Sequence, residues 1–123
     1  MKKFLILIFF FILSNLSATE YKSNFIINDF KQAQNDGKTV VVHSWNKSCY
    51  TCSKQKPILK QAQIDFEEVI FLNYEQIKDQ HIAKFLKIDY WTTIAVYKNN
   101  KEIVKAIGLK KKNEIYSLIK QGI

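Results

Sequence analysis

The chain has 123 residues, of which 47% are hydrophobic and 24% are charged, and its formal net charge is +8. This length allows one small domain and excludes two, and the hydrophobic fraction supports a core that needs no disulfide to hold it. All the basic residues are lysine. Since arginine dominates specific recognition of phosphates and bases, the positive charge indicates a solvated surface and not a nucleic-acid-binding face.

Residues 1–18 have the pattern of a secretory signal peptide. Two lysines are followed by an unbroken apolar run over residues 4–13 and then by small and polar residues that end at Ala18. The apolar run is shorter than the roughly 20 residues that a membrane-spanning helix needs. We therefore expect an exported protein, in the periplasm or another extracytoplasmic compartment, with cleavage near Ala18. Leu16 is not the small residue expected before a cleavage site, so an uncleaved membrane anchor is the alternative.

Residues 19–123 are expected to form a single domain in which strands and helices alternate. Residues 25–27 are a candidate edge strand, followed by a helix that Asn28 or Asp29 caps and that ends at Gly37. The run over residues 39–45 is β-branched and almost continuously apolar. That pattern is typical of a central strand covered on both faces.

The next helix begins at Cys49 and reaches about residue 65, and Pro57 inside it predicts a kink. Further strands are expected at 68–74, 93–97 and 101–107, and further helices at 78–87 and around 115–119. Asn99 and Asn100 fit the two-residue turn of a hairpin. Strands joined through helices are expected to be parallel and the last hairpin antiparallel. The prediction is an α/β domain with a central mixed sheet of four to five strands and helices on both faces.

Both cysteines of the chain lie where the central strand gives way to a helix, and two residues separate Cys49 from Cys52. A C-x-x-C motif in this context indicates redox chemistry. A disulfide that closes so short a loop adds little stability, so the pair is interpreted as reactive. The helix N-terminus should stabilise the thiolate of Cys49, with Cys52 less exposed one turn later. We expect Cys49 to be the nucleophile and Cys52 the resolving cysteine, with the redox-active Cys49–Cys52 disulfide and no bound cofactor.

Four landmarks around this motif resemble the thioredoxin family over residues 25–119. Trp45 precedes the first cysteine by four residues, and Pro57 follows the second by five. Residues 72–75 (Leu-Asn-Tyr-Glu) are similar to the end of the family's third strand, and Gly108 lies between the last strand and the last helix. The resemblance implies a thioredoxin-like fold and a thiol–disulfide oxidoreductase whose site Trp45 and Pro57 support. It also implies a monomer that reduces disulfides of client proteins, with electrons from an inner-membrane thiol reductant.

Three positions depart from the family pattern. Ser48 replaces a tryptophan before the first cysteine, His43 replaces a buried acid, and Thr92 replaces the cis-proline that faces the cysteines. A cis bond before a residue other than proline costs about 2.5–4 kcal/mol, so we expect a trans bond and an altered loop. Trp91, Thr92 and Thr93 form the candidate substrate-binding loop. The backbone of Thr92 is a candidate for pairing with an extended client segment.

Two alternatives stay open from the sequence. His43, on the strand beneath the cysteines, is either a proton acceptor for Cys52 or a hydrogen-bonded core residue. Two thiolates at this spacing can also hold Cu(I). The alternative function is therefore a copper-handling or thiol-carrier module that uses Cys49 and Cys52 without turnover. The sequence has no second cysteine pair to support it.

Overall fold

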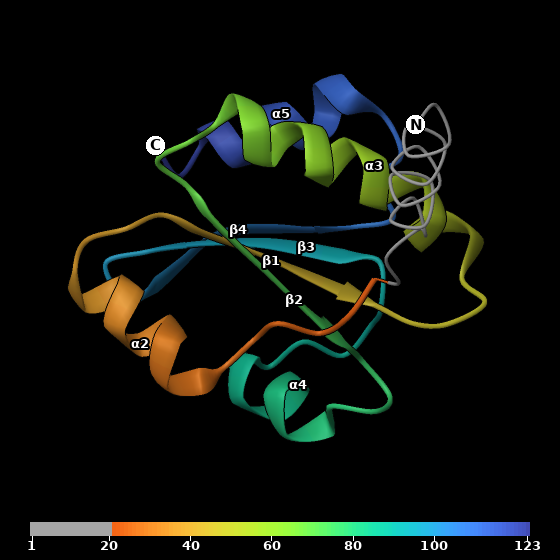
Figure 1. The fold of residues 1–123 in the computed structure, drawn as a ribbon, viewed down its shortest axis with the longest axis horizontal. Coiled ribbons are helices and arrows are strands. Elements are labelled where there is room, and N and C mark those ends of the chain that lie inside the picture. The colour runs from red at the N-terminus through yellow and green to blue at the C-terminus, as the bar shows by residue number, and fades with distance from the viewer. Residues whose placement is uncertain (1–20) are drawn as a thin grey trace, which may run out of the picture.

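The computed structural model describes residues 21–123, which form one sheet with helices on both faces (Figure 1). The strands are β1 (Val40–Trp45), β2 (Ile70–Glu75), β3 (Thr93–Lys98) and β4 (Lys101–Ile107), in the spatial order β2-β1-β3-β4. The helices are α2 (Ile27–Asn35), α3 (Tyr50–Asp65), α4 (Gln80–Leu86) and α5 (Lys112–Lys120). Helices α3 and α5 cover one face, and α2 and α4 cover the other. The fold is the predicted thioredoxin-like α/β arrangement.

The predicted signal peptide, residues 1–18, lies outside the described residues. Within residues 21–123, every helix is too short or too polar to cross a membrane.

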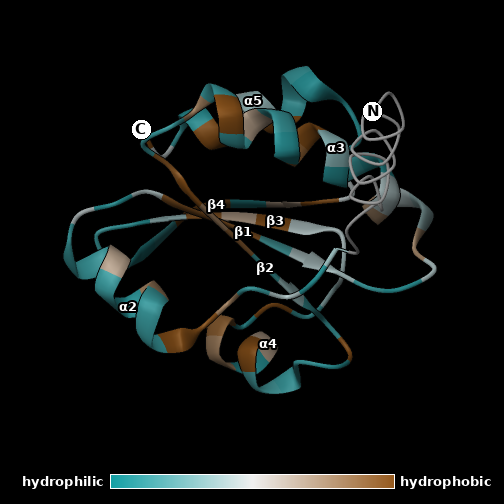
Figure 2. Cartoon of the chain, viewed as in Figure 1, coloured by the Kyte–Doolittle hydropathy of each residue, from teal (hydrophilic) through white to brown (hydrophobic). Residues whose placement is uncertain are grey.

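Strand β1 lies inside the sheet, and its side chains enter two separate cores alternately. Val40 and Val42 pack with α2 and α4, whereas Val41 packs with α3 and α5. Because both faces are covered, the strand is apolar at nearly every position, and Figure 2 shows this hydrophobic stretch between the two helix layers. The same alternation turns His43 toward α3.

The direction of β3 differs from the prediction. Strand β2 is parallel to β1, but β3 is antiparallel to β1, with His43 opposite Ile94, and β4 is antiparallel to β3. The connecting helix α4 has 7 residues. Such a helix spans about 10 Å, which cannot carry the chain back along a six-residue strand of about 20 Å. The chain therefore re-enters the sheet at the end where β2 stopped, and this places Thr92 beside the end of β1.

The predicted edge strand at residues 25–27 is absent from the described part of the chain, so the sheet there has four strands. The N–H groups of Asn24 and Phe25 both donate to the carbonyl oxygen of Asn73, at 3.0 and 3.1 Å. No ladder follows because α2 already begins at Ile27.

The start of α2 has no side-chain cap, so the predicted cap at Asn28 or Asp29 is wrong. Packing holds this end of the helix instead. The rings of Phe25 and Phe30 lie 5.3 Å apart between centroids, and both are buried in the core beneath α2 and α4. Tertiary burial of an apolar face commonly outweighs local helix signals.

The turns follow the sequence signals. Asn99 and Asn100 have φ values of 53° and 63° between β3 and β4, as a two-residue hairpin turn requires. Gly108 follows β4 with φ at 80°, a value that favours glycine. Helix α3 continues through Pro57, which is exposed.

Candidate active site

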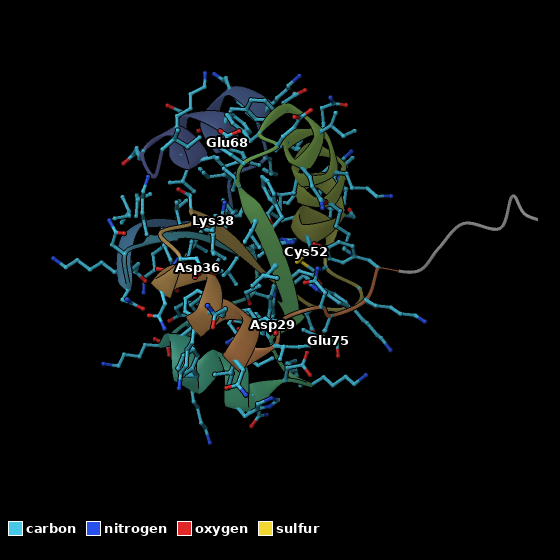
Figure 3. The ribbon with its side chains drawn as sticks, turned by 60° about the vertical axis from the view of Figure 1, so that its left-hand side comes forward. Asp29, Asp36, Lys38, Cys52, Glu68 and Glu75 are labelled. Atoms are coloured by element: carbon cyan, nitrogen blue, oxygen red, sulfur yellow. A yellow bond between two sulfur atoms is a disulfide. The ribbon has the colours of Figure 1, made fainter. Side chains whose placement is uncertain are left out.

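Cys49 and Cys52 form a disulfide at the start of α3. Their Cα atoms are 5.2 Å apart, and the Sγ atom of Cys49 accepts a hydrogen bond from the N–H of Cys52 at 3.1 Å. Cys52, labelled in Figure 3, is fully buried in the first turn of α3, whereas Cys49 is partly exposed. An incoming sulfur atom therefore reaches Cys49 first.

The backbone before α3 sets this geometry. Ser48 adopts the left-handed region, with φ at 59°, and Cys49 is extended at the N-cap position. The first N–H groups of a helix lack partners within the helix and carry partial positive charge. A sulfur atom at the N-cap accepts one of these N–H groups, so the site favours a negatively charged Cys49 when the disulfide is reduced.

His43 lies in β1 beneath α3 and is 2% exposed. Its Nδ1 is 3.1 Å from the hydroxyl of Tyr21, and its Nε2 is 2.9 Å from Oε1 of Gln55. The Gln55 Nε2 donates to the backbone carbonyls of Thr92 and Leu109, at 3.0 and 2.9 Å. Because the Gln55 amide donates there, its Oε1 must accept, and the proton of His43 is on Nε2. The hydroxyl of Tyr21 then donates to Nδ1.

The surroundings of His43 disfavour its charged form. Burial lowers the pKa of His43 to about 4; the hydrogen bond to Gln55 opposes this shift, and the charge of Lys56 adds to it. Burial also raises the pKa of Tyr21. With both ring nitrogens bonded and the ring neutral, the geometry favours the core-residue alternative over a proton acceptor for Cys52.

Trp45 forms part of the structure under the site. It is 5% exposed, and its Nε1 donates to Oδ1 of Asn73 at 2.8 Å. The ring of Tyr21 meets Trp45 edge-on at 5.1 Å between centroids. The Nζ of Lys56 lies 4.7 Å from the centroid of Tyr21 and 4.8 Å from that of Trp45. This packing ties the segment before α2 to the strand that leads to the cysteines.

Thr92 immediately precedes β3 and lies opposite the end of β1. Its φ is 66°, which is unusual for a β-branched residue, and the described residues contain no cis peptide bond. Its N–H donates to the carbonyl of Ser44 at 2.8 Å. Its carbonyl accepts from the N–H of Gly108 and from Nε2 of Gln55, each at 3.0 Å. Because both backbone groups are engaged within the fold, Thr92 has none left to pair with a client segment.

The neighbours of Thr92 face opposite ways. Thr93 is 2% exposed, and its Oγ1 donates to the carbonyl of Tyr90 at 2.7 Å. Trp91 is 44% exposed and lines a groove of about 520 Å³ with residues of α4 and the segments that flank it. Neither cysteine lines this groove. Within residues 21–123, the backbone N–H and carbonyl of Trp91 have no hydrogen-bond partner. Of the three predicted loop residues, Trp91 is therefore the one open to a client.

Residues 21–121 match the model of the Thioredoxin family. The chain belongs to this family. Among solved structures, Trxlp from Edwardsiella tarda EIB202 is 17% identical, with a TM-score of 0.74 over 80% of this chain and 98% of that chain. Thioredoxin from Fasciola hepatica is 18% identical, with a TM-score of 0.69 over 78% and 93% of the two chains. Mitochondrial thioredoxin 3 from Saccharomyces cerevisiae, in its oxidised form, is 20% identical, with a TM-score of 0.67 over 76% and 88%. Comparison with curated proteins gives no match.

A thioredoxin-family domain with a disulfide across its C-x-x-C motif is a thiol–disulfide oxidoreductase, as the sequence predicted. The likeness to the three solved structures shows the shared thioredoxin fold.

Two residues of this thioredoxin site were missed in the sequence, Gln55 and Tyr21. Gln55 is fully buried, and it lies on the same helical stripe as Cys52, Leu59 and Ala62. A polar residue within a buried stripe is the signal that could have identified it, because a buried amide requires hydrogen-bond partners.

The Cu(I) alternative gains no further ligand from the structure. Within residues 21–123, no group of three or more histidine, cysteine or acidic side chains is placed to hold a metal ion. His43 uses both ring nitrogens in hydrogen bonds. Among residues 21–123, a copper ion would therefore find the two cysteine sulfurs as its ligands after reduction of the disulfide.

Proposed function

We propose that this protein is an exported reductant of disulfides in client proteins, which acts as a monomer and receives its electrons from a thiol reductant in the membrane. The observation that carries the proposal is the asymmetry of the cysteine pair. Cys49 is partly exposed at the N-cap of α3, and Cys52 is fully buried behind it. The signal-peptide pattern of residues 1–18 supports export.

The reaction takes two exchange steps. In the reduced protein, the Cys49 thiolate attacks one sulfur of the client disulfide, the client bond breaks, and the other client sulfur leaves as a thiolate. Cys52 loses its proton and attacks the sulfur of Cys49, which forms the Cys49–Cys52 disulfide and releases the second client thiolate. The client gains two electrons from the cysteine pair; of the two protons that its thiolates take up, one is the proton released by Cys52 and the other comes from solvent. A membrane dithiol then reverses these steps at Cys49 and restores the reduced pair.

The exposed side chain of Trp91 and its free backbone groups support a contact with the client at the loop before β3. An extended segment that pairs with the Trp91 backbone would add to the exposed edge of this loop. Tyr50, which is 70% exposed next to Cys49, offers a second aromatic contact.

Client reduction tests the proposal directly. The wild-type protein should accelerate the reduction of insulin by dithiothreitol, and Cys49→Ser should abolish the acceleration because the attacking sulfur is absent. Cys52→Ser should accumulate a mixed disulfide with insulin that Cys49→Ser does not form. Absence of acceleration by the wild type, or full acceleration by Cys49→Ser, would contradict the proposal.

The same variant tests the compartment. Full-length Cys52→Ser, produced in a Gram-negative bacterium, should be recovered as mixed disulfides with client proteins in the extracytoplasmic fraction. Recovery of these adducts from the cytoplasm alone would remove the exported role and leave the oxidoreductase activity intact.

A further inference from the structure

Gln55 joins three separate parts of the fold through one buried amide group. It lies in α3, one turn after Cys52, and is fully buried. Its Oε1 accepts from His43 in β1, and its Nε2 donates to the backbone carbonyls of Thr92 and Leu109. The helix that carries the cysteines is thereby attached to the loop before β3 and to the loop after β4.

The loop that contains Thr92, residues 91–93 and called the Thr92 loop below, needs such support because the backbone of Thr92 is strained. The left-handed region is unfavourable for a residue with a side chain, and such a conformation persists only when the surroundings hold it. The Thr92 carbonyl is held by Gly108 and Gln55, and its N–H is held by Ser44. Among the described residues, Gln55 is the one side chain that bonds to the Thr92 backbone.

We propose that Gln55 is a positioning residue for disulfide exchange, which fixes the Thr92 loop, and with it Trp91, against the helix that carries Cys49 and Cys52. The inference rests on the proposed function, because it concerns how a client disulfide is aligned with Cys49. A displacement of about 1 Å in a positioning element can cost a hundredfold in rate. Gln55 touches no reacting atom, so its effect passes through the loop.

The expected effect is a selective loss of client reduction. Gln55→Met keeps the length of the side chain and removes all three hydrogen bonds. We expect the rate constant for insulin reduction to fall about ten- to a hundredfold. The rate at which iodoacetamide alkylates Cys49 in the reduced protein should change little, since that small reagent does not need the loop.

Gln34 provides a matched control. It is 1% exposed, its Nε2 donates to the carbonyls of Lys38 and Tyr97 at 3.0 and 3.3 Å, and its Oε1 accepts from the N–H of Asn100 at 2.9 Å. Like Gln55, this amide donates to two backbone carbonyls and accepts one hydrogen bond, here from a backbone N–H, and it lies at the opposite end of the sheet. Gln34→Met should lose stability in urea as Gln55→Met does, and it should keep the wild-type rate of insulin reduction.

Two outcomes would overturn the inference. One is a Gln55→Met protein that reduces insulin at the wild-type rate. The other is a Gln34→Met protein whose rate of insulin reduction falls as much as that of Gln55→Met, because the loss of rate would then follow from lost stability alone. If Gln55→Met does not fold, Gln55→Asn carries the same test, because the shorter amide cannot reach Thr92 and Leu109 together. Failure of the wild-type protein to reduce insulin at all would instead contradict the proposed function.

Discussion

The resemblance to the thioredoxin family implies a buried acid at the position of His43, and the chemistry of His43 here is that of a neutral group. An ionised carboxylate accepts a proton readily, whereas this ring already donates from Nε2 to Gln55 and accepts at Nδ1 from Tyr21. A buried ring with both nitrogens bonded pays a desolvation cost on gaining a second proton. The residue therefore contributes to stability in a way that depends on pH.

The stability contributed by His43 should decrease as the solution becomes acidic. The pKa of the ring is lowered by burial from 6.5 to about 4 on folding, so between these values the unfolded chain binds a proton that the folded chain does not. The free energy of unfolding should then fall by about 1.4 kcal/mol for each pH unit from 6.5 down to 4, and above 6.5 His43 should add no pH dependence. Urea unfolding across this range measures the slope.

Two variants isolate this effect from the titration of the carboxylates. In His43→Gln, the free energy of unfolding should depend on pH less steeply than in the wild type, by about 1.4 kcal/mol for each pH unit between 4 and 6.5. His81→Gln, which changes the exposed histidine of α4, is the matched substitution outside the hydrogen-bond network of His43. Equal slopes in the wild type and His43→Gln would mean that the buried ring is not held neutral.

Among the elements, the loop between α4 and β3 is defined by Thr92, whose backbone lies in the left-handed region and is hydrogen-bonded at both its N–H and its carbonyl. Proline fixes φ near −65° and has no N–H, whereas Thr92 has φ at 66° and donates its N–H to Ser44. The loop observed here is therefore incompatible with proline at position 92. Substitution to proline should strain the loop.

Thr92→Pro should lower the free energy of unfolding by about 3 kcal/mol or more, because it breaks the bond to Ser44 and cannot adopt the left-handed conformation. Thr92→Gly is the control, since glycine accepts this φ value and keeps the N–H. Urea denaturation compares the two variants. A Thr92→Pro protein as stable as the wild type would show that the loop refolds around the proline.

The elements that could be predicted from the sequence are those with a local signal. Strand β1 has an unbroken apolar pattern, the β3–β4 hairpin has its two asparagines, and the C-x-x-C motif marks the start of α3. The direction of β3 was missed because it depends on the length of α4 relative to the strands, which the helical pattern overestimated. The segment at 25–27 was missed because its backbone bonds to the single carbonyl of Asn73 instead of forming a ladder.

The hydrogen-bond network of the site could not be predicted for a different reason. Gln55 meets His43, Thr92 and Leu109 across separations of 12, 37 and 54 residues. Such contacts depend on tertiary packing, and no local pattern records them. The cysteines themselves were evident because their spacing is local, while the groups that position them are assembled from four segments of the chain.

At the level of the molecule, the proposed reduction of client disulfides requires that the Cys49–Cys52 pair be a sufficiently strong reductant. The direct measurement is the reduction potential of this pair, obtained by equilibrating the purified protein with defined ratios of reduced and oxidised dithiothreitol or glutathione and counting free thiols. A reductant should have a potential close to that of thioredoxin, about −270 mV. A potential near about −120 mV, which is typical of a strong oxidant, would contradict the claim and assign the protein to disulfide formation.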